Sequence, residues 1–260
     1  MSVRPTTQAP WWSPLRPRGE PLPAPRARLL VVPHSGGGPG RYLRLVGELP
    51  GDVEILGLTL PGRERRRAEP PGATLDEVLG SLTAIPGPDV PTLVLGHSLG
   101  ATLGLHLAHA LGERCAGLIA SGQQPRESTG WLTEDSSDED VLRLLERGGG
   151  MPPALLSGTG RQTALLDNLR ADLRLGAESA RRSRGVRVGA PITVLCGRED
   201  RLVDLDALAG WGAHSAAGCE VHVLPGGHFA LFDPVNRPRY VEAVERHLTA
   251  RTPRCAARAN

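Results

Sequence analysis

Short apolar runs alternate with helical patterns along most of the chain. The runs are bounded by Gly and Pro, as expected for strands buried on both faces of a parallel sheet. Between them, apolar residues recur three and four positions apart, which is typical of amphipathic helices. In the clearest case, 74–85, Thr74 and Glu77 have capping-box spacing. The alternation predicts an α/β fold with a doubly wound, mostly parallel sheet. The predicted strands are 29–33, 53–60, 92–96, 117–121, 192–197 and 220–224.

The alternation stops between residues 122 and 189. This span has no strand pattern but predicts two amphipathic helices. One follows Ser136, with Glu139 completing a second capping box, and the other surrounds Leu169. We therefore interpret residues 123–189 as a helical lid inserted into an α/β core.

The remaining boundaries follow from composition. The core is predicted to comprise 28–122 and 190–250, followed by a C-terminal tail, 251–260. Residues 1–27 are rich in Pro and Arg and are expected to form an extended arm, with Trp11 and Trp12 anchored on the surface.

Composition excludes several classes of protein. With 260 residues, 40% hydrophobic and 22% charged, the chain resembles a soluble single-domain protein, and no apolar run is long enough to cross a bilayer. The N-terminal region lacks the apolar stretch of a secretory signal, so we expect a cytoplasmic protein. A net charge of +2 argues against nucleic-acid binding. The four cysteines form no C-x-x-C pair, which argues against a zinc site or a disulfide framework.

A G-x-S-x-G motif lies between the predicted strand 92–96 and a helical pattern. Its members are Gly96, Ser98 and Gly100. Two glycines relieve the Cβ clashes of a sharp strand-to-helix turn, and the following helix N-terminus favours developing negative charge. The alternative is a tight turn with a capping serine. The flanking strand and helix favour a nucleophile elbow with Ser98 as nucleophile.

A serine nucleophile needs a histidine base, and the sequence offers eight. In this fold the order along the chain is serine, acid, histidine, with the histidine after the last strand. His228 fits because it follows the predicted strand 220–224 and a Gly-Gly pair. The other histidines are expected to pack or to lie on the surface.

The acid should orient the imidazole from the end of a strand. Asp200 follows strand 192–197, whereas no carboxylate follows Ser121. Three nearby acids are alternatives: Glu199, Asp204 and Asp206. For each of them, the simpler explanation is that it is a solvated acid at the start of a helix.

A glycine-rich loop follows the first predicted strand, from Pro33 to Gly40. Its spacing does not fit a dinucleotide-binding loop, because Arg41 or Leu43 occupies the last required glycine position. We expect the loop to supply a backbone N–H of an oxyanion hole from Ser35, beside that of Leu99. A plain flexible turn is the alternative.

Taken together, these blocks resemble the stand-alone type II thioesterases of polyketide synthases and nonribosomal peptide synthetases. The matching blocks are 32–37, 60–63, 96–100, 191–200 and 225–229, in this order. The resemblance implies the same functional residues as the motifs do: Ser98, His228 and Asp200 as the triad, and Ser35 with Leu99 as oxyanion donors. Ser35 replaces the usual alanine, and the arginine-rich 63–67 is a second departure.

The resemblance also implies a substrate. Such enzymes hydrolyse acyl groups from the phosphopantetheine arm of acyl or peptidyl carrier domains and so clear stalled chains. They need no metal or cofactor, and we expect a monomer. Apolar residues of the lid and one beside His228 are candidates for contacting the acyl chain, with packing as the alternative: Val141, Leu142, Leu145, Leu165, Leu169, Leu173 and Phe229.

Four arginines are candidates for docking an acidic carrier domain, although a charged loop is usually solvated surface: Arg63, Arg65, Arg66 and Arg67. A carboxylesterase or lipase would use the same triad. A noncatalytic binding protein of the same fold is a further possibility, against which the intact triad argues.

Overall fold

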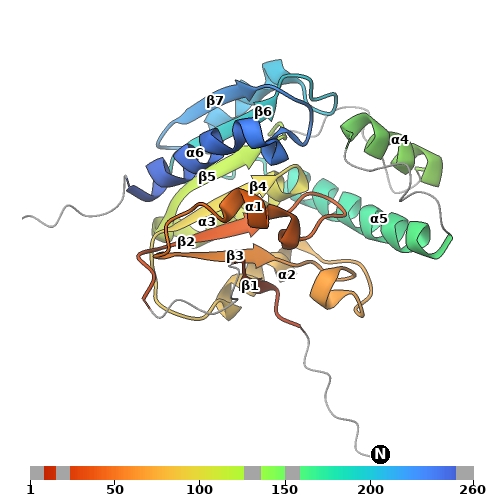
Figure 1. The fold of residues 1–260 in the computed structure, drawn as a ribbon, viewed down its shortest axis with the longest axis horizontal. Coiled ribbons are helices and arrows are strands. Elements are labelled where there is room, and N and C mark those ends of the chain that lie inside the picture. Colours follow the sequence, from red (N-terminus) through yellow and green to blue (C-terminus); the bar gives the residue numbers. More distant parts are fainter. Residues whose placement is uncertain (1–8, 16–23, 126–135, 150–158, 250–260) are drawn as a thin grey trace, which may run out of the picture.

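The computed structural model describes residues 9–15, 24–125, 136–149 and 159–249. At its centre is a seven-stranded sheet with the order β1-β3-β2-β4-β5-β6-β7 (Figure 1). Strands β2 to β7 pair in parallel, and β1 pairs antiparallel with β3. The strands are β1 (Trp12–Pro14), β2 (Ala27–Val32), β3 (Val53–Leu58), β4 (Thr92–His97), β5 (Cys115–Ser121), β6 (Ile192–Gly197) and β7 (Cys219–Leu224).

Helices cover both faces of this sheet. The helices α2 (Leu75–Gly80), α3 (Leu99–Leu111) and part of α5 (Thr159–Arg182) share one core, and α1 (Leu43–Val46) and α6 (Arg237–Thr249) share the other. Successive residues of one strand serve opposite cores, because side chains alternate across a sheet. In β2, Leu30 faces the α3 side, whereas Val31 faces the α6 side. The predicted α/β doubly wound fold is confirmed.

One of the two predicted capping boxes is confirmed. At α2, Glu77 N–H donates to Thr74 Oγ1 at 3.2 Å and Thr74 N–H donates to Glu77 Oε2 at 2.8 Å. The second predicted capping box was wrong by one residue. At α4 (Asp138–Gly148) the reciprocal pair is Ser137 and Asp140. Adjacent serines and a run of acids gave the pattern two possible registers, so local sequence did not decide between them.

The N-terminal arm departs from the prediction, because Trp12–Pro14 forms the edge strand β1. Trp12 is buried, and its indole N–H donates to Ser81 Oγ at 2.8 Å. Trp11 is half-buried beneath the guanidinium of Arg66, 4.0 Å from the ring centre. The expected surface anchoring of Trp12 was therefore wrong. A three-residue strand next to prolines shows no alternation from which it could be recognised.

Between β5 and β6, the described residues contain two long helices, α4 and α5. Figure 1 shows both lying beyond the carboxyl ends of the strands, where α5 continues toward α3. A small apolar cluster of Val141, Leu166 and Leu169 joins α4 to α5. Among the described residues, no helix is both long enough and apolar enough to span a bilayer.

Candidate active site

The turn from β4 into α3 holds Ser98 in a strained conformation, with φ 54° and ψ −121°. A side-chain-bearing residue rarely adopts a positive φ, and such strain is concentrated at functional sites. A Cβ on Gly96 would lie 2.0 Å from Gly100 O, and one on Gly100 would lie 2.0 Å from Val32 O. Both glycines are therefore sterically required. The sharp turn leaves Ser98 only partly covered at the carboxyl edge of the sheet.

His228 and Asp200 form a buried pair beside this turn. His228 Nδ1 lies 2.8 Å from Asp200 Oδ2, and Leu202 N–H donates to Asp200 Oδ1 at 2.9 Å. The two side chains are 4% and 0% exposed. An Nδ1–H that donates to the carboxylate leaves Nε2 as the proton acceptor. The Ser98 side chain makes no capping hydrogen bond to α3, which argues against the alternative of a turn with a capping serine.

Two of the three competing acids are engaged elsewhere. Glu199 Oε2 accepts a hydrogen bond from Gly226 N–H at 2.6 Å. Asp204 Oδ1 accepts one from Asp206 N–H at 3.0 Å and so caps the 3-10 helix Leu205–His214. Asp200 is thus the carboxylate that the structure brings to His228.

Two further histidines surround the pair, and both are buried. The ring of His97 lies 4.9 Å from that of His228, and the ring of His34 lies 5.7 Å from that of His97. Burial, reinforced by the charge of Arg41, lowers the pKa of His34 to about 3. Burial likewise holds the pKa of His97 well below its usual value. Both are therefore neutral near pH 7, so neither adds a positive charge beside His228.

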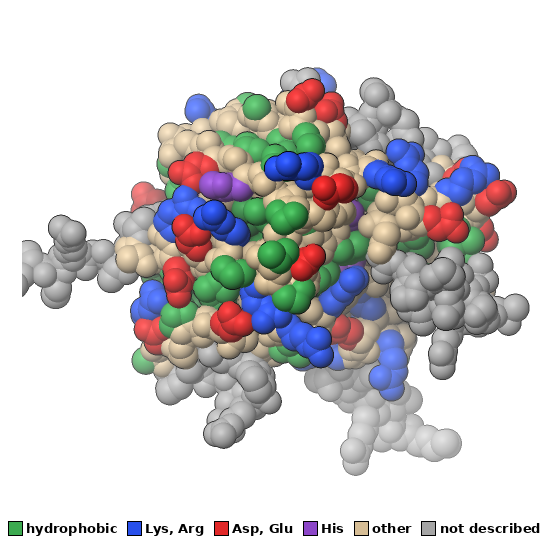
Figure 2. All heavy atoms as spheres, turned by 45° about the horizontal axis from the view of Figure 1, so that its top comes forward, with side chains coloured by type: hydrophobic (Ala, Val, Ile, Leu, Met, Phe, Trp, Pro, Cys, Tyr) green, Lys and Arg blue, Asp and Glu red, His purple; other side chains and the backbone are tan. Residues whose placement is uncertain are grey.

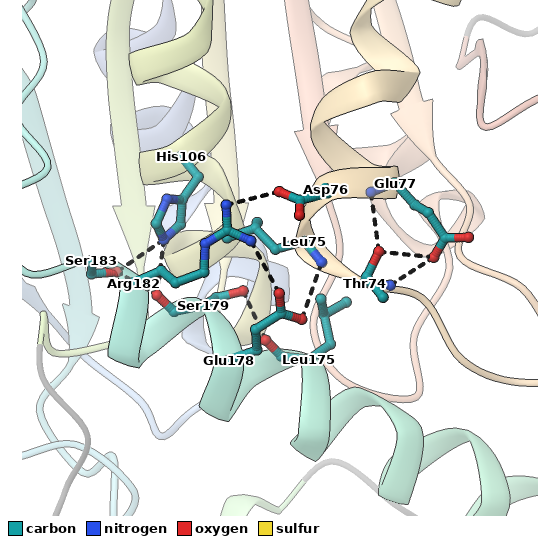
Figure 3. Close-up of polar contacts among 10 residues, drawn as sticks. All are labelled: Thr74, Leu75, Asp76, Glu77, His106, Leu175, Glu178, Ser179, Arg182 and Ser183. Atoms are coloured by element: carbon teal, nitrogen blue, oxygen red, sulfur yellow. Dashed lines mark hydrogen bonds and ion pairs between the residues drawn. The ribbon is translucent and has the colours of Figure 1, made fainter.

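Three histidines other than His228 have structural partners among the described residues. His97 Nδ1 lies 3.0 Å from Ser121 Oγ, which is 2.8 Å from the Tyr240 hydroxyl. His106 Nε2 lies 2.9 Å from the carbonyl oxygen of Ser179 on α5 (Figure 3). His247 Nε2 lies 2.9 Å from Thr193 Oγ1.

The glycine-rich loop after β2 forms a tight turn. Gly37 N–H donates to His34 O at 3.0 Å, and Gly36, at the third position of the turn, has φ +71°. This positive φ is what a type II turn requires. The N–H of Gly36 donates to Asp172 Oδ2 at 2.7 Å. Within the part of the chain that the structure describes, the N–H of Ser35 has no such partner.

The predicted acyl-contact residues divide into two groups: Val141 and Leu169 are buried, and the others are partly buried. Leu169 is buried, and its Cδ2 lies 3.1 Å from the position of a Cβ on Gly36, so it packs under the glycine loop. Phe229 lies beside the candidate base, with ring centres 5.1 Å apart, and carries the guanidinium of Arg41 on its ring at 4.6 Å. Four leucines of α4 and α5 are partly buried around the cluster that contains Val141: Leu142, Leu145, Leu165 and Leu173.

The end of α4 also reaches the site. A Cβ on Gly148 would lie 3.1 Å from Leu202 Cδ1 and 3.9 Å from His228 Cδ2. Arg147 donates from Nη2 to the carbonyl oxygen of Arg201 at 3.4 Å. The predicted lid segment therefore contacts the loop that carries the acid as well as the imidazole of His228.

Two of the four proposed docking arginines are not available to a partner. Arg63 is 7% exposed and forms an ion pair with Asp172 at 2.7 Å. Arg66 is 3% exposed; it pairs with Glu69 and donates to Thr59 O at 3.1 Å. Their assignment to docking was wrong, because each is buried in an ion pair. The partner of Arg63 is distant in the sequence, whereas that of Arg66 is three residues away. Arg65 and Arg67 are exposed.

The sequence interpretation missed Asn168 and Asp172. Both lie on the face of α5 that packs against the core. A signal existed, since these two polar residues interrupt an otherwise apolar helix face at a spacing of one turn. Their partners lie more than a hundred positions away along the chain, so the pattern alone named no contact.

A parallel sheet, a strained serine turn into a helix and a buried histidine–aspartate pair define the α/β-hydrolase class. Residues 27–250 match the family model of the thioesterase domain. The chain therefore belongs to the thioesterase family and is a hydrolase of acyl thioesters. The resemblance to type II thioesterases is confirmed by its relatives.

Among curated proteins, it is 30% identical to Thioesterase PikA5 of Streptomyces venezuelae, over 83% of this chain and 79% of the relative. Among solved structures, the type II thioesterase BorB from the borrelidin biosynthetic cluster is 27% identical with a TM-score of 0.75, covering 94% of this chain and 99% of its own. The type II thioesterase YbtT from the yersiniabactin pathway is 26% identical with a TM-score of 0.75, covering 92% and 98%.

Proposed function

We propose that this thioesterase removes acyl groups from the phosphopantetheine arm of carrier domains in a synthase or synthetase, with Ser98, His228 and Asp200 as its catalytic triad. The observation that carries the proposal is the buried His228–Asp200 pair next to a strained, partly exposed Ser98. Relatives from polyketide and nonribosomal peptide pathways support the choice of carrier-bound substrates.

In the proposed first step, Ser98 Oγ attacks the thioester carbonyl while His228 Nε2 takes the hydroxyl proton. The oxyanion is held by the backbone N–H groups of Ser35 and Leu99. That Gly36 N–H is already bonded to Asp172 supports the choice of Ser35 as the donor from this loop. When the oxyanion collapses, the carbon–sulfur bond breaks and the pantetheine thiol departs with a proton from His228.

In the second step, His228 takes a proton from water, and the resulting nucleophile attacks the acyl-serine. Collapse of the second oxyanion releases the carboxylic acid and returns the proton to Ser98. A thiol has a pKa near ~8.5 and leaves more readily than an amine, so His228 matters most as a base. The proposed reaction needs no metal or cofactor.

The exposed Arg65 and Arg67 are proposed to attract an acidic carrier domain. Their position supports this role, since neighbouring Arg63 donates to Gly37 O of the glycine loop at 3.3 Å. The segment that carries them therefore adjoins the candidate oxyanion hole. Charged groups at such a rim mainly increase the rate of encounter.

The proposal is tested by comparing hydrolysis of an acyl-pantetheine thioester on a carrier protein with hydrolysis of the p-nitrophenyl ester of the same acid. A fluorophosphonate probe should label the wild-type protein at Ser98. The Ser98→Ala variant should lose labelling and lower turnover by roughly 10⁵-fold, with thermal stability nearly unchanged. A variant that kept a tenth of the activity would remove Ser98 from the mechanism. Preference for the oxygen ester would favour a carboxylesterase.

A further inference from the structure

One helix of the predicted lid, α5, packs against both loops of the candidate oxyanion hole. Leu165 and Leu169 lie under Gly36, with their Cδ atoms 3.7 Å and 3.1 Å from the position of a Cβ there. Two turns further along, Gly176 faces Leu99, whose Cδ1 lies 3.3 Å from the position of a Cβ on the glycine. The helix thus forms a wall behind both proposed oxyanion donors.

Asp172 lies midway along this wall and bonds to the glycine loop. Its Oδ2 accepts hydrogen bonds from Gly36 N–H and from Arg63 Nη1, each at 2.7 Å. Its Oδ1 accepts a third from Arg63 Nη2, also at 2.7 Å. Arg63 in turn donates to Gly37 O at 3.3 Å. The carboxylate therefore holds the turn directly through one N–H and indirectly through the guanidinium.

Asn168, one helical turn earlier, completes the contact. Its Nδ2 donates to Gly62 O at 3.1 Å, and its Oδ1 accepts from Arg63 Nη2 at 3.4 Å. Arg63, Asn168 and Asp172 are all buried. Two segments of the core, 61–63 and 34–37, are thus joined to a single face of α5.

A buried ion pair of this kind contributes little net stability, because desolvation offsets most of the attraction. Its geometric effect is larger. A peptide unit is planar, with its N–H and C=O pointing in opposite directions. The Gly37 N–H bond to His34 O fixes the peptide that carries Ser35 N–H, and the Asp172 bond fixes the next peptide. Together they determine where Ser35 N–H points.

We propose that Asp172 of α5 is a positioning residue that sets the oxyanion hole, acting through Gly36 N–H and Arg63. This inference rests on the proposed function, because it explains how the proposed oxyanion donor, Ser35 N–H, is held in position. An amide at position 172 has one acceptor oxygen in place of two, so it cannot accept from Gly36 N–H and from both Arg63 nitrogens. The turn is then free to rotate the Ser35 peptide out of line. In this proposal, α5 contributes to catalysis by holding the glycine loop in place, without contacting the reacting atoms.

The C-terminal half of α5 offers a matched control. Glu178 Oε2 accepts a hydrogen bond from Leu75 N–H at 3.2 Å, and Arg182 pairs with Asp76 at 2.8 Å (Figure 3). Figure 3 shows that both contacts are made with residues at the start of α2. Glu178→Gln therefore removes a carboxylate of α5 that accepts a backbone N–H, as Asp172→Asn does, but leaves the oxyanion loop untouched.

The test measures hydrolysis of a small acyl-pantetheine thioester, inhibition by the corresponding trifluoromethyl ketone and the rate of fluorophosphonate labelling. Removing one oxyanion donor typically lowers kcat by about 10²–10³-fold, so misplacing one should lower it by about 10–100-fold. For Asp172→Asn we expect this fall in kcat with KM nearly unchanged. The ketone, whose adduct with Ser98 carries an oxyanion, should bind more weakly by a similar factor. Glu178→Gln should change none of these.

Equal effects of Asp172→Asn and Glu178→Gln, or unchanged ketone affinity in Asp172→Asn, would overturn the proposal. If Asp172→Asn does not fold, the double variant Arg63→Met/Asp172→Leu leaves no unpaired buried charge and should still show weaker ketone binding. Should the wild-type protein hydrolyse no pantetheine thioester, the proposed function fails. Labelling rates still decide the role of Asp172, because phosphonylation of Ser98 also uses the oxyanion hole.

Discussion

At the scale of single residues, the candidate site combines local and long-range features. The strain at Ser98 follows from G-x-S-x-G and its flanking strand and helix, so a single stretch of sequence predicted it. His228 and Asp200 followed from the order of residues in this class of fold. The Arg63–Asp172 pair could not be predicted in this way, because its partners are 109 positions apart and each side chain alone suggests an exposed charge.

The assignment of Asp200 leads to a ranking of variants. Asp200→Asn should lower kcat by about 10⁴-fold, because an amide at this position favours the wrong tautomer of His228. Asp204→Asn should have little effect, since its carboxylate caps a 3-10 helix. Steady-state kinetics of the two purified variants checks this, and the reverse order would move the acid to Asp204.

The buried neutral histidines predict acid sensitivity. The pKa of His34 is lowered to about 3 in the folded protein, whereas in the unfolded chain it is near ~6.5. The unfolded state therefore binds more protons between these values, and the free energy of unfolding should fall as pH drops below about 6.5. Each such histidine contributes up to about 1.4 kcal/mol per pH unit.

Urea unfolding between pH 4 and 7 measures this dependence. His34→Gln removes one titrating group, so we expect a shallower dependence on pH than in the wild-type protein, whatever the change in stability at pH 7. Parallel curves for the two proteins would show that His34 does not titrate in this range.

At the scale of elements, the positions of β2 to β7 were predicted to within two residues. The strands β2 to β6 are buried along their whole length and show continuous apolar runs, which made them easy to recognise. The pattern also predicted helices in the span that contains α4 and α5. It could not show which apolar residues of α5 pack and which remain accessible, since both kinds occupy the same helix face. That distinction depends on what lies opposite each turn.

Leu169 and Leu173 provide a direct comparison on α5. Leu169 is 3% exposed beneath Gly36, whereas Leu173 is only partly buried. Leu169→Ala should lower the free energy of unfolding by about 2–5 kcal/mol and Leu173→Ala by clearly less. Chemical denaturation gives both values. Similar small losses would indicate that Leu169 faces an acyl channel rather than the core.

At the scale of the whole molecule, charge is distributed rather than concentrated. The net charge is +2, and Figure 2 shows basic and acidic side chains interspersed over one face. An attraction to carrier domains would therefore depend on local groups such as Arg65 and Arg67. Screening acts over roughly 8 to 10 Å at physiological salt, so the effect should depend strongly on ionic strength.

We expect kcat/KM toward an acyl carrier protein to fall steeply between low and physiological salt, whereas a small pantetheine thioester should respond little. Arg65→Glu/Arg67→Glu should reproduce the loss at low salt with the carrier substrate alone. The control is Arg26→Glu/Arg114→Glu, which changes the charge by the same amount. These arginines directly precede β2 and β5, at the amino ends of the strands, whereas the candidate site lies at the carboxyl ends. Equal responses of the two double variants would contradict docking by Arg65 and Arg67.

The strand β1 has a consequence for self-association. By pairing with β3, it occupies backbone N–H and C=O groups that would otherwise form an unpaired strand edge. At the other edge, β7 exposes Val221 and Val223, but the charged pair Glu220 and Arg246 lies along it, a common protection against edge-to-edge pairing. We expect a chain that began after Leu15 to expose the edge of the apolar strand β3 as a template for a second molecule, and therefore to aggregate more readily than the full chain.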